Sequence, residues 1–257
     1  MLPTRLTGPK LYLFVVIVTA AHPWLTQTLE ARINPETAAK TLHFVKAFVA
    51  DERLSVLRRE PNLKSIIIHR LRTTRPVYIF GARAAAGDQP AFYRVAVTRR
   101  TRGWIHQSAV VIPGRVGDDQ KLLILIDETK ESSDKIALSN LLIANFNRSP
   151  LVPQALLKLG EEAERCAASL NSHARKRLAD LNASLPNAAP RDYYLNDSGL
   201  DRFNKLQVNY DFNQATGEYV YDGKAYQQIL ARFPSSEEAR KARAHLDATH
   251  QRLAKRP

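Results

Sequence analysis

The chain has 257 residues, 44% of them hydrophobic and 25% charged, which is enough for one large domain or two smaller ones. Its 38 Lys and Arg against 25 Asp and Glu give a net charge of +13, which favours anionic partners: nucleic acid, acidic glycans, phospholipid headgroups or acidic proteins. The single cysteine, Cys166, excludes an intrachain disulfide, so the fold must depend on its hydrophobic core.

Residues 1–31 have the pattern of a secretory signal peptide. Arg5 and Lys10 precede an unbroken apolar run over 11–21, which ends in small residues. We therefore expect export to the periplasm or cell envelope, and the lack of a cysteine just after the run excludes a bacterial lipoprotein. The run is shorter than the ~20 apolar residues of a transmembrane helix. Because no Asp, Glu, Lys or Arg occurs over 11–29, an uncleaved anchor, the one case in which membrane contact is expected, stays an alternative. A buried N-terminal helix is another.

The segment 32–50 is expected to form a short helix or linker. Asn34 or Thr37 can cap a helix, and the apolar residues that follow have helical spacing. The predicted helix covers 34–52, and its apolar face would consist of Leu42, Phe44, Val45, Phe48 and Val49.

Short β-type segments replace the helical pattern over 51–113. They are rich in β-branched and aromatic residues and are separated by turn-like stretches such as "REPNLK" and "AAAGDQP". Five strands in about 60 residues suit a small, strongly curved sheet or barrel, because a lone hairpin buries too little surface. The predicted strands are "LSV" (54–56), "SIIIHRL" (65–71), "PVYIFGA" (76–82), "FYRVAVTRR" (92–100) and "GWIHQSAVV" (103–111).

Helical spacing dominates the rest of the chain. A helical hairpin is expected over 114–185, a Tyr-rich connector over 186–223 and a second hairpin over 224–257. Within the connector, "YDFNQATGEYVYDG" also has the pattern of a β-hairpin. The expected fold class is therefore multidomain α+β: a small barrel followed by an all-α helical-hairpin region.

The two hairpins share a faint repeat at an offset of 87 residues. In each copy a helix ends in Phe, a Ser lies in the turn, and Ala occurs where the two helices would cross. The matching pairs are Ala144 and Ala231, Phe146 and Phe233, Ser149 and Ser236, Ala155 and Ala242, and Leu159 and Leu246.

Residues 51–111 resemble the bacterial SH3 (SH3b) domains of exported and cell-wall proteins. The resemblance rests on "FYRV" followed eleven residues later by Gly103-Trp104-Ile105, and on the L-x-V opening strand. It implies a small barrel closed by a strand that contains Trp104, with Gly103 allowing the turn into it. The chain departs from the family in its first loop, where Leu57-Arg58-Arg59-Glu60-Pro61 contains no glycine.

The helical hairpins resemble tetratricopeptide-type repeats of envelope assembly proteins. The pattern "A-x-x-x-F-P-x-S-x-x-A-x-x-A" is matched by "AYQQILARFPSSEEARKARAHL" (225–246), and by "NLLIANFNRSPLVPQALLKL" (140–159) except that Asn147 replaces the turn proline. Such repeats bind protein partners, so the resemblance implies a protein-binding helical region.

No catalytic, metal or cofactor motif stands out. Cys166 lies inside a helical stretch and is interpreted as a small buried side chain. The seven histidines have no metal-ligand spacing, and there is no nucleophile elbow, phosphate loop or dinucleotide fingerprint. We therefore expect a protein that is not an enzyme, with no catalytic residue, metal or cofactor.

Basic residues concentrate in the strand-rich segment. Residues 51–115 contain 13 Lys and Arg against 4 Asp and Glu, a net +9. Arginines beside an aromatic ring can hold an anionic glycan or a peptide carboxylate by charge-assisted hydrogen bonds and stacking. The alternatives are a solvated hairpin with a core-lining tryptophan and a surface for single-stranded nucleic acid, which the signal peptide disfavours. The predicted ligand-binding residues are Tyr78, Phe92, Tyr93, Arg94, Arg100, Arg102 and Trp104.

Tyrosines concentrate in the connector, where they either form a recognition surface or pack the segment onto the helices. The predicted partner-binding residues are Tyr193, Tyr194, Tyr210, Tyr219 and Tyr221.

The leading hypothesis is a non-enzymatic envelope protein that binds and scaffolds. Its barrel would contact peptidoglycan, another anionic envelope glycan or a peptide, and its helices a protein partner. The alternatives are an inert accessory or regulatory subunit of a wall-remodelling enzyme or secretion system, and a basic nucleic-acid-binding protein.

Overall fold

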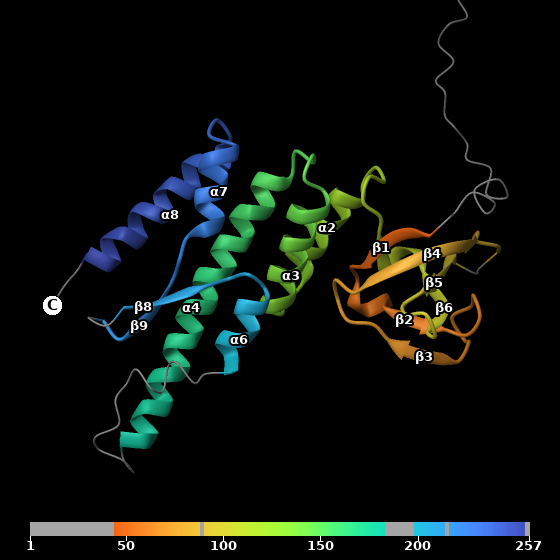
Figure 1. Ribbon diagram of the computed structural model, residues 1–257, viewed down its shortest axis with the longest axis horizontal. Helices are drawn as coiled ribbons and strands as arrows, with labels where there is room; N and C mark the ends of the chain where they lie inside the picture. Colours follow the sequence, from red (N-terminus) through yellow and green to blue (C-terminus); the bar gives the residue numbers. More distant parts are fainter. Residues whose placement is uncertain (1–43, 88–89, 183–197, 214–215, 255–257) are drawn as a thin grey trace, which may run out of the picture. The chain divides into compact units, whose positions relative to one another are not determined.

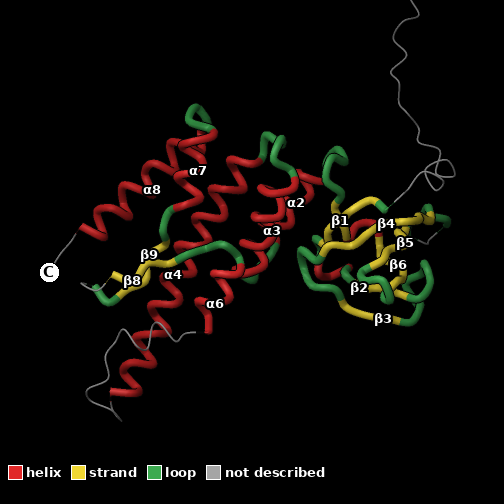
Figure 2. The backbone as a smooth tube through the Cα atoms, in the orientation of Figure 1, coloured by secondary structure: helices red, strands yellow, loops and turns green. Residues whose placement is uncertain are grey.

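The computed structural model describes residues 44–87, 90–182, 198–213 and 216–254, all of which lie in the unit Pro35–Pro257. The fold is mixed α+β: a seven-stranded antiparallel sheet is followed by helices and one two-stranded hairpin (Figure 1). Figure 2 shows the change from strands to helices along the chain. The predicted signal peptide, 1–31, lies outside the described residues.

The seven strands pair in the order β3-β2-β6-β5-β4-β1-β7. All of the pairings are antiparallel, and the described ladders leave β3 and β7 as the two edges. Strands occur in four of the five predicted segments, the last of which divides into β6 and β7, whereas the segment 54–56 overlaps β2 only at Val56. The strands are β1 (Val45–Val49), β2 (Val56–Arg58), β3 (Ile67–Arg70), β4 (Pro76–Arg83), β5 (Phe92–Ala96), β6 (Arg102–His106) and β7 (Val110–Val111).

The helix predicted over 34–52 is wrong where the structure describes it, because β1 occupies Val45–Val49. Both faces of this strand are covered. Ala47 and Val49 pack in the core of the sheet, whereas Phe48 packs in the core formed with the helices. A strand that is buried on both faces loses the alternation of apolar and polar residues, so its apolar spacing can imitate a helix.

The core of the sheet consists of short apolar side chains from every strand except β3. Its buried members are Ala47, Val49, Leu57, Leu71, Val77, Ile79, Val95, Ile105, Ala109 and Val110. Gly103 packs against β2, and a Cβ there would lie 2.7 Å from the Arg58 carbonyl oxygen and 2.8 Å from Leu57 Cγ. The prediction that Gly103 allows a turn is therefore wrong. Gly103 lies within β6, where the absence of a side chain lets β2 approach closely.

Five of the helices contribute buried residues to a second, larger core. The six α-helices of the described residues are α2 (Asp118–Glu128), α3 (Ser132–Asn145), α4 (Val152–Asn182), α6 (Ser198–Lys205), α7 (Lys224–Arg232) and α8 (Glu237–Ala254). Residues from α2, α3, α4, α7 and α8 belong to one buried cluster, so the two predicted hairpin regions pack together. Within the described residues, no helix combines the length and the hydropathy that a bilayer span needs.

The turns after α3 and α7 are built alike. Phe146 and Phe233 each end a helix, and their carbonyl oxygens accept hydrogen bonds from the N–H groups of Ser149 and Ser236. Each serine hydroxyl then accepts a hydrogen bond from a backbone N–H at the start of the following helix, as an N-terminal capping serine does.

The connector 186–223 contains α6 and the hairpin of β8 (Tyr210–Asn213) and β9 (Glu218–Tyr221). The β-hairpin expected from its sequence is therefore present. Tyr219 of β9 packs against Ala174 of α4, and Asn171 of the same helix hydrogen-bonds to the backbone N–H and C=O groups of Tyr219.

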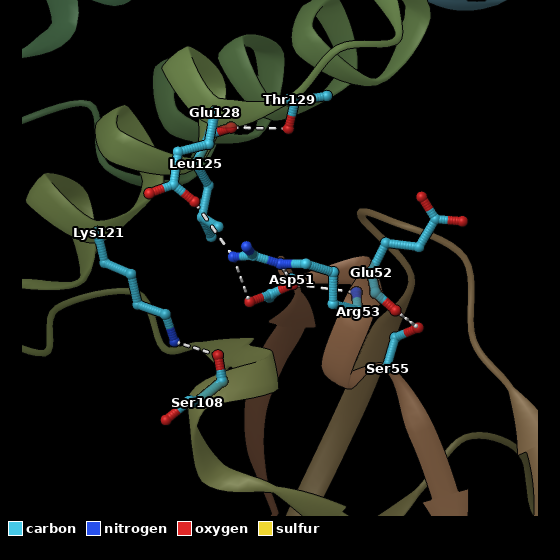
Figure 3. A network of polar contacts seen from close by, with 9 residues as sticks. All are labelled: Asp51, Glu52, Arg53, Ser55, Ser108, Lys121, Leu125, Glu128 and Thr129. Carbon is cyan, nitrogen blue, oxygen red and sulfur yellow. Dashed lines mark hydrogen bonds and ion pairs between the residues drawn. The ribbon is translucent and has the colours of Figure 1, made fainter.

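The sheet and α2 are joined by apolar and polar contacts. Phe48 and Val111 pack among buried residues of the helices. Figure 3 shows Arg53 between two carboxylates, with its guanidinium nitrogens 3.0 Å from Asp51 Oδ1 and 3.1 Å from Glu128 Oε2. Lys121 of α2 donates to the Ser108 carbonyl oxygen at 2.6 Å, next to β7.

Candidate functional site

Strand register brings basic and aromatic side chains onto one face of the sheet. Residues directly opposite each other on antiparallel strands share a face, so each row of partners can be followed across the sheet. One row runs Lys46, Tyr78, Ala96, Arg102 from β1 to β6. The second runs Gly81, Arg94, Trp104, Arg58 from β4 to β2. We call the surface formed by Lys46, Arg58, Tyr78, Phe80, Arg94, Arg102 and Trp104 the basic-aromatic face.

Phe80 joins the two rows. The β4–β5 register shifts between Ile79 and Gly81, at the position of Phe80. The Arg94 guanidinium carbon lies 5.2 Å from the Phe80 ring centre, and that of Arg102 lies 5.7 Å from it. Arg94 is also 6.0 Å from the indole centre of Trp104. Two guanidinium groups and two aromatic rings therefore form one contiguous cluster.

Phe44 extends this cluster beyond the start of β1. Its ring centre lies 6.3 Å from that of Phe80, and 64% of its surface is exposed. Tyr78 is 42% exposed, whereas Phe80 and Trp104 are half-buried. Aromatic surface is therefore available to a ligand beside the arginines.

The arginines of this face have unused hydrogen-bonding capacity. Arg94 and Arg102 are exposed, and within the described residues neither forms an ion pair with a carboxylate. Each guanidinium has five N–H donors in a planar fork that fits a carboxylate or phosphate in bidentate fashion. Because the rings already hold both side chains, a bound anion orders them at a smaller entropic cost.

Four of the predicted ligand-binding residues come together on the basic-aromatic face: Tyr78, Arg94, Arg102 and Trp104. Arg100 is exposed in the β5–β6 turn, where its backbone N–H donates to Thr98 Oγ1 at 3.2 Å. Arg100 therefore lies at the tip of the hairpin rather than in either cross-strand row.

Phe92 and Tyr93 do not fit the prediction that they contact a ligand. Phe92 is fully buried and packs edge-on against His106. Tyr93 lies opposite Ile105 on the core side, and its hydroxyl accepts a hydrogen bond from Arg115 Nη1 at 2.8 Å. Since Arg115 also binds Asp118, Tyr93 helps to fix the start of α2.

Sequence reasoning missed Phe80, Lys46 and Arg58. Phe80 occurs two residues after Tyr78 on the same strand, and alternation along a strand could have identified it. Lys46 lies in the segment whose pattern predicts a helix, and Arg58 reaches this face only through the pairing of β2 with β6.

The predicted partner-binding tyrosines serve packing instead, where the structure describes them. Tyr219 and Tyr221 are each 4% exposed. The Tyr221 hydroxyl accepts the N–H of Ala225 at 2.9 Å, and Tyr210 donates to the Ala163 carbonyl oxygen at 3.1 Å. Burial raises the pKa of both Tyr210 and Tyr221 above the ordinary range. Tyr193 and Tyr194 lie outside the described residues.

Among the described residues, neither the cysteine nor a group of metal-binding side chains forms a competing site. Cys166 is 5% exposed, which confirms its interpretation as a buried small side chain, and burial raises the pKa of its thiol. No group of three or more His, Cys, Asp or Glu in the described ranges is placed to hold a metal ion.

The chain matches no protein-family model, no curated protein and no solved structure. Function is therefore inferred from the residues of this chain alone.

Proposed function

We propose that the protein is a non-enzymatic binding and scaffolding protein of the cell envelope. In this proposal the sheet belongs to the bacterial SH3 class, its basic-aromatic face binds peptidoglycan or a similar anionic glycan, and the helices contact a protein partner. The predicted signal peptide supports export. The small antiparallel sheet, with Gly103-Trp104-Ile105 on β6 beside "FYRV" on β5, supports the SH3-like assignment.

One observation carries the proposal: Arg94 and Arg102 are held over the Phe80 ring without a carboxylate partner among the described residues. Peptidoglycan offers the matching chemistry, since its sugar rings can lie against aromatic faces and its peptide carboxylates can accept guanidinium hydrogen bonds. The net charge of +13 adds a long-range attraction to the same polymer.

The face also differs from a general basic surface. A charged surface alone attracts anions without discrimination and loses them at high salt. Rings placed between the guanidinium groups add apolar contacts that persist when charges are screened. We therefore expect binding that weakens with salt but is not abolished by it.

The test is co-sedimentation of the full chain with purified peptidoglycan. The arginine variant is Arg94→Gln with Arg102→Gln, and the aromatic variant is Trp104→Ala. A matched control is Arg232→Gln, because Arg232 lies 5.0 Å from the Phe233 ring centre in a similar pair on a helix. Each variant is checked for an unchanged urea midpoint, so that loss of binding is not mistaken for loss of fold.

We expect the arginine variant to bind at least roughly tenfold more weakly, which corresponds to about 1.4 kcal/mol, and the control to bind like the parent. Blocking the carboxylates of the peptidoglycan by methyl esterification should weaken the parent to a similar degree. Unchanged sedimentation of a folded arginine variant would overturn the proposal. Tighter binding to single-stranded DNA than to peptidoglycan would favour the nucleic-acid alternative instead.

A further inference from the structure

The two edges of the seven-stranded sheet differ in whether side chains hydrogen-bond to their backbone groups. At β7, Lys121 Nζ donates to the Val110 carbonyl oxygen at 3.0 Å, and Asp118 Oδ2 accepts the N–H of Ile112 at 2.6 Å. Side chains from α2 therefore occupy backbone groups along this edge. At β3, no strand lies on the outer side within the described residues, and no side chain there hydrogen-bonds to the backbone of Ile67–Arg70.

The hydrogen bonds between β2 and β3 show which backbone groups of β3 are free to pair. Leu71 donates to the Ser55 carbonyl oxygen at 2.8 Å, and Arg59 donates to that of Ile66 at 3.0 Å. The first bond flanks the pair Val56–Arg70, and the second flanks the pair Arg58–Ile67. In an antiparallel ladder, the two residues of such a flanked pair do not bond to each other, and their N–H and C=O groups point away from the partner strand. The backbone groups of Ile67 and Arg70 therefore face outward, where an additional strand could bind them.

Exposed apolar side chains gather at the same edge. Eight large hydrophobic side chains are exposed in the described residues, and half of them occur on β3 or just before it. This concentration is unusual, because single exposed apolar residues are normally scattered. The four are Leu63 (51% exposed), Ile66 (63%), Ile67 (47%) and Ile68 (37%).

Positive charge surrounds this apolar edge. Residues 58–75 contain six Lys and Arg and one Glu, a net +5. Two such edges repel each other, because each carries this excess of positive charge. An acidic strand meets the opposite situation, since its carboxylates are attracted to Lys64 and Arg70. The charges therefore favour an acidic partner over a second copy of the chain.

We propose that β3 binds an extended, acidic and apolar segment of a partner protein as an additional β-strand. Backbone hydrogen bonds to Ile67 and Arg70 supply the pairing, the isoleucines supply apolar contacts, and the flanking basic residues select acidic side chains. This is a second site, distinct from the glycan-binding function proposed above, and it gives the sheet one surface for the glycan and one edge for a protein.

The test uses a synthetic peptide in which glutamate alternates with valine, and measures amide hydrogen exchange of the full chain with and without it. The expected result is slower exchange of the backbone N–H groups of Ile67 and Arg70, because these become hydrogen-bonded to the peptide. A peptide held by side chains alone would leave both rates unchanged. Protection confined to other strands, or no protection at saturating peptide, would overturn the proposal.

Variants test whether peptide binding depends on the backbone N–H of Ile67 and on the charge of the flanking basic residues. Ile67→Pro removes the outward N–H and should weaken peptide binding at least tenfold, whereas Ile67→Thr keeps it and should weaken binding less. Lys64→Glu with Arg70→Glu should reverse the preference, so that a lysine-valine peptide binds better than the glutamate-valine peptide. Arg243→Glu, an exposed change on α8, is the charge control and should have no effect.

Two further outcomes are decisive. If the unliganded chain forms dimers that Ile67→Pro abolishes, the occupant of β3 is a second copy and the acidic-partner proposal fails. Peptidoglycan co-sedimentation of Ile67→Pro should equal that of the parent, since the basic-aromatic face is intact. Failure of the peptide test therefore leaves the glycan proposal standing, and failure of the glycan test leaves this one.

Discussion

Arg94 and Trp104 lie directly opposite each other on β5 and β6, with the guanidinium carbon 6.0 Å from the centre of the indole ring. A ligand that binds Arg94 must therefore alter the surroundings of this tryptophan. Since the chain has only two tryptophans, a Trp24→Phe variant makes Trp104 the sole indole reporter.

We predict that the fluorescence of Trp104 in the Trp24→Phe chain changes when soluble peptidoglycan fragments are added. Arg94→Gln in this background should shift the titration midpoint to about tenfold higher fragment concentration, because a charge-assisted contact is lost. Arg232→Gln is the control and should keep the midpoint of the parent. A flat emission signal at fragment concentrations that saturate co-sedimentation would contradict the prediction.

Gly103 provides the second prediction, because β2 approaches it closely. A Cβ at Gly103 would meet the Arg58 carbonyl oxygen at 2.7 Å, and backbone atoms in a paired strand cannot easily move away. We expect Gly103→Ala to lower the free energy of unfolding by about 1–3 kcal/mol. Urea denaturation measures this loss.

Gly81→Ala is the comparison for that experiment. Its added Cβ would lie 3.3 Å from Arg94 Cβ, which a small shift relieves. It should therefore cost less than Gly103→Ala. Equal costs at both positions would mean that strand propensity, rather than the approach of β2 to β6, sets the requirement for glycine at position 103.

Local sequence pattern was enough to place most of the strands and helices. Turn residues and β-branched runs marked strands that the structure contains, and three- and four-residue spacing marked the helices. It failed at β1, where burial of Phe48 on one side and Ala47 on the other removes the alternation that identifies a strand. At the tyrosines of the hairpin it left recognition and packing as alternatives, because sequence does not show which side of a hairpin a core will cover.

The candidate face could be predicted only in part for a related reason. Arg94, Arg102 and Trp104 are close in sequence and lie on one hairpin, so a local cluster revealed them. Arg58 joins the basic-aromatic face because β2 pairs with β6, which is distant in sequence. The register shift at Phe80 depends on the pairing of β4 with β5. Such pairings are set by tertiary packing, which a single sequence does not display.

The third prediction concerns the contact between the two helical regions at Gly160 and Tyr226. A Cβ at Gly160 would overlap the Tyr226 ring at Cε1, so Gly160→Ala must displace this ring or widen the spacing between α4 and α7. Gly160→Ala should lower the free energy of unfolding by about 1–3 kcal/mol, even though alanine favours a helix by about 1 kcal/mol over glycine.

A double-mutant cycle separates these effects. In a Tyr226→Leu background the ring is absent, so Gly160→Ala should be neutral or should raise stability by up to about 1 kcal/mol. The free energies come from urea denaturation of the four chains. If Gly160→Ala costs the same in both backgrounds, the two residues do not limit how closely α4 and α7 approach.

The last prediction is a pH dependence that arises where the turn before α4 meets α2. Ser149 Oγ donates to Asp119 Oδ2 at 2.6 Å. This hydrogen bond holds the pKa of Asp119 below its ordinary value of 3.8. Burial of the carboxyl group opposes the effect to a smaller degree, and hydrogen bonds from backbone N–H groups add to it. A carboxyl group with a depressed folded pKa adds stability above its unfolded pKa and loses it as pH falls through the folded one.

Ser149→Ala should therefore lower the free energy of unfolding by about 1 kcal/mol at pH 7, and by less as pH falls below 3.8. A part of the difference should persist in acid, because Ser149 also accepts the N–H of Leu151 as a cap. Ser236→Ala is the matched control: its hydroxyl accepts the N–H of Ala239, so its cost should change little between pH 7 and pH 3. Urea denaturation across this pH range compares the two serines. If both differences are equally independent of pH, Ser149 acts through its capping bond alone and the charge of Asp119 contributes nothing.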